Sequence, residues 1–374
     1  MSDFIAIAAI IMQRPMFLGY WNASLGLILL IVSLTISILA TRPPYRISRD
    51  AAKIAAISII VSTANSAINS GAGIAISIKV IIINILVICA IFLRPNVNID
   101  RMHRTTRWVF RIIIFSGLTT MAISRYSFSN LPDLTLFNIP IKDRGATEYF
   151  SVYFPLSTIP YPMTTERLVL MRNTFLTIEP GVAVFIVLLW RHLEGVKSGI
   201  RRIFLDLIFA LSLAATASTT SPIMFAIWFF FRKVSEDKKV LTSRNFVRVI
   251  LGLMCGYLLI FYTPFFGINE KSLTHGSSFE DRIDWYTGET GIRRAASLSL
   301  VILYYILVRN YLSNSYFYIF VASFVVCALN VLSFTPLFFL AAYTCLRTPN
   351  ATAKNATVLK KEPLIGARHR NNNH

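Results

Sequence analysis

Long apolar runs separated by short polar linkers form the dominant pattern of this chain. Several of them, such as residues 17–40, 74–93 and 108–124, approach or exceed the ~20 residues that a helix needs to cross a bilayer. Runs of this kind recur along the whole chain up to residue 346. The pattern therefore predicts an all-α fold in which residues 1–346 form one polytopic membrane domain with about 11 transmembrane helices (roughly 10–12).

Composition agrees with a membrane protein. Hydrophobic residues make up 55% of the chain, charged residues only 15%, and the mean hydropathy is +0.60. Soluble domains carry about 25% charged residues. The net charge of +19 lies mainly in short linkers, such as residues 42–49 and 94–107. The positive-inside rule places such linkers in the cytoplasm beside anionic headgroups, so we predict membrane lipids, and no nucleic acid, as their partners.

Three apolar runs are predicted to be short or broken helices. Residues 4–12 are too short to span a bilayer, and an Arg-Pro dipeptide follows them. Residues 203–231 have basic residues on both flanks, which predicts a hairpin of two short helices that meet at residues 218–222. Residues 316–346 contain a Thr-Pro interruption and are predicted to form a last hairpin. Broken helices are tolerated at membrane depth only where they line protein or a cavity.

Two long polar segments, about 125–177 and 263–294, are predicted on the periplasmic side, opposite the basic linkers. Both concentrate acidic residues, and the first also contains several prolines and aromatic residues. Prolines exclude long helices there, while aromatic rings favour an ordered loop at the membrane surface. These rings suit either an interfacial belt or stacking against sugars. Residues 347–374 are basic and Asn-rich, which predicts a disordered cytoplasmic tail.

No metal or cofactor site is predicted. The four cysteines lie within apolar runs without paired or metal-like spacing, which predicts free, buried thiols; they are Cys89, Cys255, Cys327 and Cys345. The histidines are scattered, and four of the five fall in segments predicted to be cytoplasmic; they are His103, His192, His275, His369 and His374.

The segment from Arg167 to Gly181 is the strongest candidate for function. It places Arg167, Arg172 and Glu179 just before the apolar run 182–190. Pro180 suits a first helical position, and a carboxylate is favoured at that end by the helix dipole. One interpretation is therefore structural: a well-started helix with a snorkelling arginine nearby.

A functional interpretation follows from a resemblance. The pattern Arg172-x6-Glu179-Pro180-Gly181 ahead of a span resembles the motif of bacterial O-antigen and exopolysaccharide polymerases (Wzy-type, of the O-antigen ligase-like superfamily). Thr216-x-Ser218-Thr219-Thr220-Ser221 resembles the Thr-x-Ser-Arg often found in that family. In the second outer segment, Phe279-Glu280-Asp281-Arg282-Ile283-Asp284-Trp285 resembles the Arg-x3-Trp commonly seen there. The layout of two outer loops on roughly eleven spans is also similar.

Two positions depart from the family pattern. No arginine follows the Thr-x-Ser element, where Thr220, Ser221 and Pro222 stand instead, so any role of that arginine is unfilled or moved. The Phe-x-Glu spacing is loosened as well, since Phe175 lies four residues before Glu179.

The resemblance implies a metal-independent membrane glycosyltransferase at the periplasmic face of the bacterial inner membrane. It would polymerise undecaprenyl-pyrophosphate-linked oligosaccharides in O-antigen, capsule or exopolysaccharide synthesis. A sugar hydroxyl of the incoming unit would attack the anomeric carbon of the nascent chain, and a lipid pyrophosphate would leave. A chain-length regulator and a flippase would be further partners, and no cofactor would be needed.

Residue roles follow from that chemistry. Arginine binds phosphate through a planar fork that stays charged, so we assign Arg172 and Arg282 to the pyrophosphates, with Arg167 and Arg125 behind them. Glu179 would be the general base or would orient Arg172, and His275 is the other candidate base. For substrate binding we add the side chains of the two remaining motifs, which are Trp285, Ser218 and Ser221.

Two other classes stay open. An O-antigen ligase would share the fold and the lipid donor, and an essential outer-loop histidine such as His275 would favour it. A flippase or other transporter would carry charged groups deep within its spans. Candidates for such groups are Lys53, Lys79 and Asp206, although Asp206 is most simply an intrahelical partner of Arg202, one turn away.

Overall fold

The computed structural model describes most of the chain up to residue 346. The described residues are 2–13, 16–40, 47–69, 74–94, 99–126, 135–140, 149–158, 162–164, 169–171, 174–177, 180–195, 198–216, 218, 220–236, 242–262, 288–329 and 334–346. The predicted tail and residues 263–287 of the second polar segment lie outside them.

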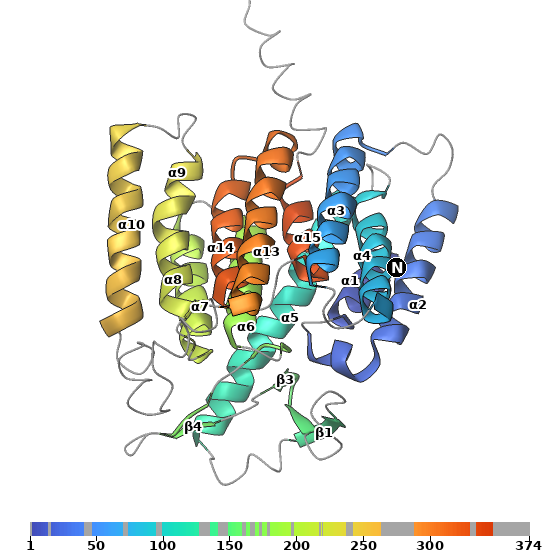
Figure 1. The fold of residues 1–374 in the computed structure, drawn as a ribbon. Coiled ribbons are helices and arrows are strands. Elements are labelled where there is room, and N and C mark those ends of the chain that lie inside the picture. Colours follow the sequence, from blue (N-terminus) through green and yellow to red (C-terminus); the bar gives the residue numbers. More distant parts are fainter. Residues whose placement is uncertain are drawn as a thin grey trace, which may run out of the picture.

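The described residues are mostly helical, as predicted, and their helices stand side by side with short strands gathered at one end (Figure 1). The first half contains α1 (Ser2–Ile11), α2 (Phe17–Leu39), α3 (Arg49–Ile68), α4 (Ile74–Phe92) and α5 (Ile99–Tyr126). The second half contains α6 (Pro180–Glu194), α7 (Ile200–Ala215), α8 (Thr220–Ala226), α9 (Arg232–Glu236), α10 (Ser243–Tyr262), α13 (Gly288–Val308), α14 (Tyr316–Leu329) and α15 (Pro336–Thr344).

Three described helical stretches are long and apolar enough to cross a membrane. They are Arg49–Ile68, Asp100–Ile123 and Gly291–Tyr311. Large apolar side chains also face outward from several helices, including Ile60 on α3, Trp108 on α5, Ile203 on α7 and Phe246 on α10. An exposed apolar surface of this extent is typical of contact with a membrane or a partner.

Helix α6 forms the centre of the bundle. It begins at Pro180, as the sequence predicts, and every side chain from Val182 to Trp190 is buried. Its neighbours are α5, α7, α8 and α14. A helix that is apolar on all sides must be covered on all sides, which explains why α6 is enclosed by other helices.

The predicted breaks are confirmed where the structure describes them. Helix α1 ends at Ile11, α7 and α8 are separate helices on either side of Ser218, and α14 and α15 are separate helices ending at Leu329 and beginning at Pro336. The sequence did not predict η5, a π-helix over Ile227–Phe231 that joins α8 to α9. A short 3₁₀ turn, η6 (Arg309–Tyr311), follows α13.

The first long polar segment contains short strands, a departure from the all-α prediction. Antiparallel strands β1 (Thr135–Pro140), β2 (Tyr149–Tyr153) and β3 (Ser157–Thr158) form one sheet, and β4 (Pro162–Thr164) pairs with β5 (Val169–Met171). Ser116 of α5 donates to the Leu156 carbonyl at 2.7 Å, and Thr120 donates to that of Phe154 at 2.9 Å. The strands satisfy backbone groups that prolines keep out of helices.

The cysteine prediction is partly wrong. The four cysteines are free, but only Cys345 is buried, whereas Cys89, Cys255 and Cys327 are half-buried. The apolar run in which each cysteine lies does not fix which side of its helix faces the neighbouring helices.

Candidate functional site

Most of the predicted site residues lie outside the described residues. They are Arg167, Arg172, Glu179, His275, Arg282 and Trp285. Their assignment to pyrophosphate binding, proton transfer and sugar binding therefore stays a prediction. Arg125 belongs to the last turn of α5, where the structure describes its backbone. Ser218 and Ser221 are described with their side chains.

The helix ends that carry these predicted residues lie at one end of the bundle. The end of α5, the beginning of α6 and the α7–α8 junction are all at the end where the strands gather (Figure 1). The end of α10 and the beginning of α13, which flank the second polar segment, lie there too. The fold thus brings the flanks of both polar segments to the same side of the molecule, which we call the strand end.

At the α7–α8 junction the hydroxyl groups bind one another. The hydroxyls of Thr216 and Ser221 are 2.6 Å apart, and the Ser218 hydroxyl accepts from the Thr220 backbone N–H at 3.3 Å. All four side chains are buried. These bonds satisfy polar groups freed by the helix break, which burial would otherwise make costly. The described partners of Ser218 and Ser221 are therefore structural, and substrate binding by them stays a prediction.

The chain turns into α6 through strained backbone. Phe175 and Leu176 have φ of 43° and 66°, in the left-handed region that residues with a Cβ rarely adopt, and both are buried. Thr174 and Thr177 hold the turn: the Thr177 hydroxyl donates to the Thr174 carbonyl at 2.8 Å, and the Thr174 N–H donates to the Thr158 carbonyl at 3.0 Å. Strain of this kind persists only where surrounding contacts enforce it, and it clusters at functional sites.

The opposite end of the bundle is rich in cations. The starts of α3, α5, α7 and α10 and the ends of α6 and α13 all lie there (Figure 1). The basic side chains in the first or last turns of these helices, or near them, and on α9 include Arg49, Lys53, Arg101, Arg104, Arg107, Arg201, Arg202, Arg232, Lys233, Arg244, Arg248 and Arg309. We call this the basic end.

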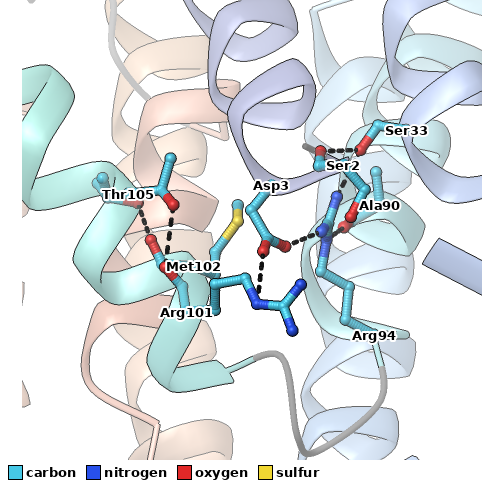
Figure 2. A network of polar contacts seen from close by, with 9 residues as sticks. Ser2, Asp3, Ser33, Ala90, Arg94, Arg101, Met102 and Thr105 are labelled. Carbon is cyan, nitrogen blue, oxygen red and sulfur yellow. Dashed lines mark hydrogen bonds and ion pairs between the residues drawn. The ribbon is translucent and has the colours of Figure 1, made fainter. Parts of the chain in front are cut away.

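A buried charge network near the basic end was missed by sequence reasoning. Asp3 of α1 binds Arg94, which follows α4, at 2.5 Å, and Arg101 of α5 lies 3.7 Å from the same carboxylate (Figure 2). Arg94 also donates to the Ser33 hydroxyl and the Ala90 carbonyl, each at 2.6 Å. Asp3 and Arg94 are almost fully buried. The network fastens the short first helix to three others.

Two further ion pairs meet at the end of α6. Glu194 accepts two hydrogen bonds from Arg111 of α5, at 2.5 and 2.6 Å. Arg191 binds Asp206 of α7 at 2.5 Å, whereas Arg202 lies 3.3 Å from that carboxylate. The predicted intrahelical pair of Arg202 and Asp206 is thus present, but the closer partner comes from another helix. The sequence feature that could have indicated these ion pairs is the presence of Arg191 and Glu194 at the end of an apolar run.

On fold alone, the chain is a mostly helical protein with three described helices able to cross a membrane. Comparisons with protein-family models, curated proteins and solved structures gave no match. Among the described side chains, no group of three or more histidines, cysteines and carboxylates is placed to hold a metal ion.

Proposed function

We propose that this chain is a bacterial inner-membrane protein with about 11 spans that polymerises undecaprenyl-pyrophosphate-linked oligosaccharides at the periplasmic face. The product would be O-antigen, capsule or exopolysaccharide. Glycosyl transfer would pass the nascent chain to the incoming unit, with Arg172 and Arg282 binding the lipid diphosphates and Glu179 or His275 accepting the proton of the attacking hydroxyl.

One observation carries the proposal: the strained turn into α6 lies at the strand end, across the bundle from the basic end. The positive-inside rule puts the basic end in the cytoplasm, so the Arg172-to-Gly181 motif would face the periplasm, where lipid-linked units are joined. A periplasmic position is what the polymerase interpretation requires.

The chemistry explains why fixed cations are needed there. Negative charge develops on the leaving lipid diphosphate, and preorganised cations in a partly dry site stabilise such charge most effectively. The enclosed helix α6 would give this site a rigid base, because its side chains from Val182 onward are packed on all sides.

The direct test is a strain from which the gene has been deleted. Surface glycan made of single repeat units supports polymerase activity, because ligation and export would continue without polymerisation. Loss of all surface glycan would instead indicate the ligase or the transporter. In the complemented strain, we expect Arg172→Lys and Arg282→Lys to reduce long polymer by ~100-fold, the scale of losing one preorganised donor to developing charge.

Arg309→Lys at the basic end is the matched control, since it makes the same substitution away from the proposed site. It should leave chain length unchanged. Normal polymer from Arg172→Lys and Arg282→Lys proteins that insert at wild-type levels would refute the assigned roles.

A transporter of lipid-linked oligosaccharides is the second candidate, favoured by three ion pairs in each of which at least one partner is buried. Asp3–Arg94, Arg111–Glu194 and Arg191–Asp206 are charges within or beside apolar helices, a feature typical of transport pathways. In proteoliposomes, a transporter would move a labelled lipid-linked unit across the bilayer without lengthening it, whereas a polymerase would lengthen it.

A further inference from the structure

Three buried threonines surround the left-handed turn that precedes α6. Thr174 and Thr177 stand on either side of Phe175 and Leu176, and Thr158 belongs to the strand β3. None of the three threonines is more than 1% exposed, so their side chains face protein and not solvent. We call Thr158, Thr174 and Thr177 the threonine cluster.

Each hydroxyl of the threonine cluster binds another member of it. The hydroxyls of Thr158 and Thr174 are 2.5 Å apart, and the Thr174 hydroxyl also donates to the Thr158 carbonyl at 3.1 Å. The Thr177 hydroxyl donates to the Thr174 carbonyl at 2.8 Å. Because a buried hydroxyl without a partner is costly, loss of one member leaves polar groups of the others unsatisfied. The cluster therefore acts as a unit.

The backbone between Thr174 and Thr177 forms a type I′ turn. Both central residues have positive φ, and the Thr177 N–H donates to the Thr174 carbonyl at 2.8 Å, which are the features of that turn type. Such turns usually carry Asn and Gly, because most other residues adopt positive φ only at a cost. Here the central residues are Phe175 and Leu176, so contacts around the turn, and not the preference of its residues, must stabilise it.

The turn is fixed to the bundle on both sides. On one side it is bound to β3, which contacts α5 and follows the Leu156 carbonyl that accepts from Ser116 of α5. On the other side Thr177 forms an isolated antiparallel bridge with Met16, in the connection between α1 and α2. The threonine cluster thus holds the turn in a defined place relative to three helices.

The turn separates the two halves of the proposed motif along the chain. Arg172 comes two residues before Thr174, and Glu179 comes two residues after Thr177. Both motif residues lie outside the described residues. A type I′ turn reverses the chain and suits a hairpin, in which residues at equal distances from the turn are neighbours. The six-residue spacing between Arg172 and Glu179 is the spacing that such a hairpin requires to pair them.

We propose that the threonine cluster is a positioning device: it holds the type I′ turn, and the turn sets Arg172 beside Glu179. Glu179 then orients the guanidinium through charge-assisted hydrogen bonds. Thr158, Thr174 and Thr177 are positioning residues, since they are buried and act through the motif. The inference rests on the proposed function, because the group that is positioned is the one assigned there to the lipid diphosphate.

The first test measures this geometry without glycosyl transfer. In the full chain without its native cysteines, Arg172→Cys/Glu179→Cys is oxidised in membranes, and remaining thiols are counted with a maleimide of high mass. A disulfide needs Cα atoms about 4.4–6.8 Å apart, so we expect this pair to cross-link. Arg167→Cys/Glu179→Cys is the control, because Arg167 is five residues further from the turn, ~16 Å along an extended strand. Equal yields from the two pairs, or no cross-link in the first, would overturn the proposal.

The second test removes one hydroxyl of the cluster. Thr174→Val should lower the yield of the Arg172→Cys/Glu179→Cys cross-link. With the lipid-linked repeat unit extracted from the deletion strain as substrate, it should lower kcat by ~10–100-fold and change KM by less than ~3-fold, because a misplacement of about 1 Å can cost 100-fold in rate. Thr174→Ser keeps the hydroxyl and should restore both. Thr119→Val, which removes an exposed hydroxyl on α5, is the matched control and should change neither.

The outcomes separate this inference from the proposed function. Unchanged cross-linking and kcat in Thr174→Val protein at wild-type membrane levels would overturn the inference and leave the polymerase proposal standing. Wild-type protein that forms the cross-link but makes no polymer would refute the polymerase proposal and retain the role of the cluster in holding the turn. If Thr174→Val protein does not accumulate, the comparison of the two cysteine pairs decides the question.

Discussion

Arg191 carries a charge in an almost fully buried position at the end of the central helix. Its partner Asp206 lies 2.5 Å away, and its guanidinium stacks on the Trp228 ring. A buried charge is costly unless it is paired and hydrogen-bonded, and these contacts supply the pairing. Its position in the last turn of α6 adds a favourable interaction with the helix dipole.

The two partners of Asp206 should therefore differ in their contribution to stability. We expect Arg191→Gln to lower the free energy of unfolding by about 1.5–3 kcal/mol, the range for hydrogen bonds to charged groups. Arg202→Gln should cost about 0.5 kcal/mol or less, because its side chain is 40% exposed and the pair is an i,i+4 pair on one helix. Unfolding of both variants in the same detergent measures the difference. Equal losses would contradict the assignment of Arg191 as the principal partner.

At the scale of elements, the short helix α1 is held in place by close packing against α2 as well as by the ion pair between Asp3 and Arg94. Gly26 of α2 lies against the chain that leaves α1: a Cβ at that position would be 2.9 Å from the Met12 carbonyl oxygen and 2.5 Å from Nε2 of Gln13. The missing side chain lets α1 fold back along α2, where Ser33 donates to the Ser2 carbonyl at 2.6 Å.

We accordingly expect Gly26→Ala to destabilise the protein by about 1–3 kcal/mol, the usual cost of overpacking, and to loosen α1. Gly256→Ala in α10 is the matched control. A Cβ there meets nothing within 4 Å, so stability should stay the same or rise by up to ~1 kcal/mol through helix propensity. Thermal unfolding and limited proteolysis near the N-terminus report both effects. A neutral Gly26→Ala would show that α1 is not closely packed on α2.

At the scale of the whole molecule, charge and structure are distributed along one axis. Most of the described cations lie at the basic end, although Arg293 and Arg294 lie near the beginning of α13 at the strand end. Exposed apolar side chains surround the helices, and the strands lie at the strand end (Figure 1). This is the distribution that a bilayer selects, because Lys and Arg stay on the cytoplasmic side while apolar surface faces lipid.

The proposed orientation predicts opposite labelling of the two ends. In a variant without the native cysteines, Leu136→Cys on β1 should react with a membrane-impermeant maleimide in intact cells, since Leu136 is exposed at the strand end. Arg104→Cys at the start of α5 should react only after the membrane is permeabilised. The reverse pattern would place the Arg172-to-Gly181 motif in the cytoplasm and would end the polymerase proposal.

The sequence by itself determined the helical class and the positions of the breaks. Apolar run length and the local effects of proline act over a few residues, so the beginning of α6 at Pro180, the α7–α8 junction around Ser218 and the beginning of α15 at Pro336 were predictable. For the candidate site, the residue types and motifs could be read from the sequence. Six of its nine residues lie outside the described part of the chain, so their assembly stays a prediction.

Only the tertiary structure decided which charges pair with each other. Asp3 and Arg94 are 91 residues apart, and Arg111 and Glu194 are 83 apart, so no local pattern could pair them. The strands and the left-handed turn at Phe175 depend on contacts within the first polar segment that apolar run length does not report. Local sequence sets what each segment can form, whereas burial by distant segments sets which polar groups must find partners, because an unpaired buried charge or backbone group is too costly to keep.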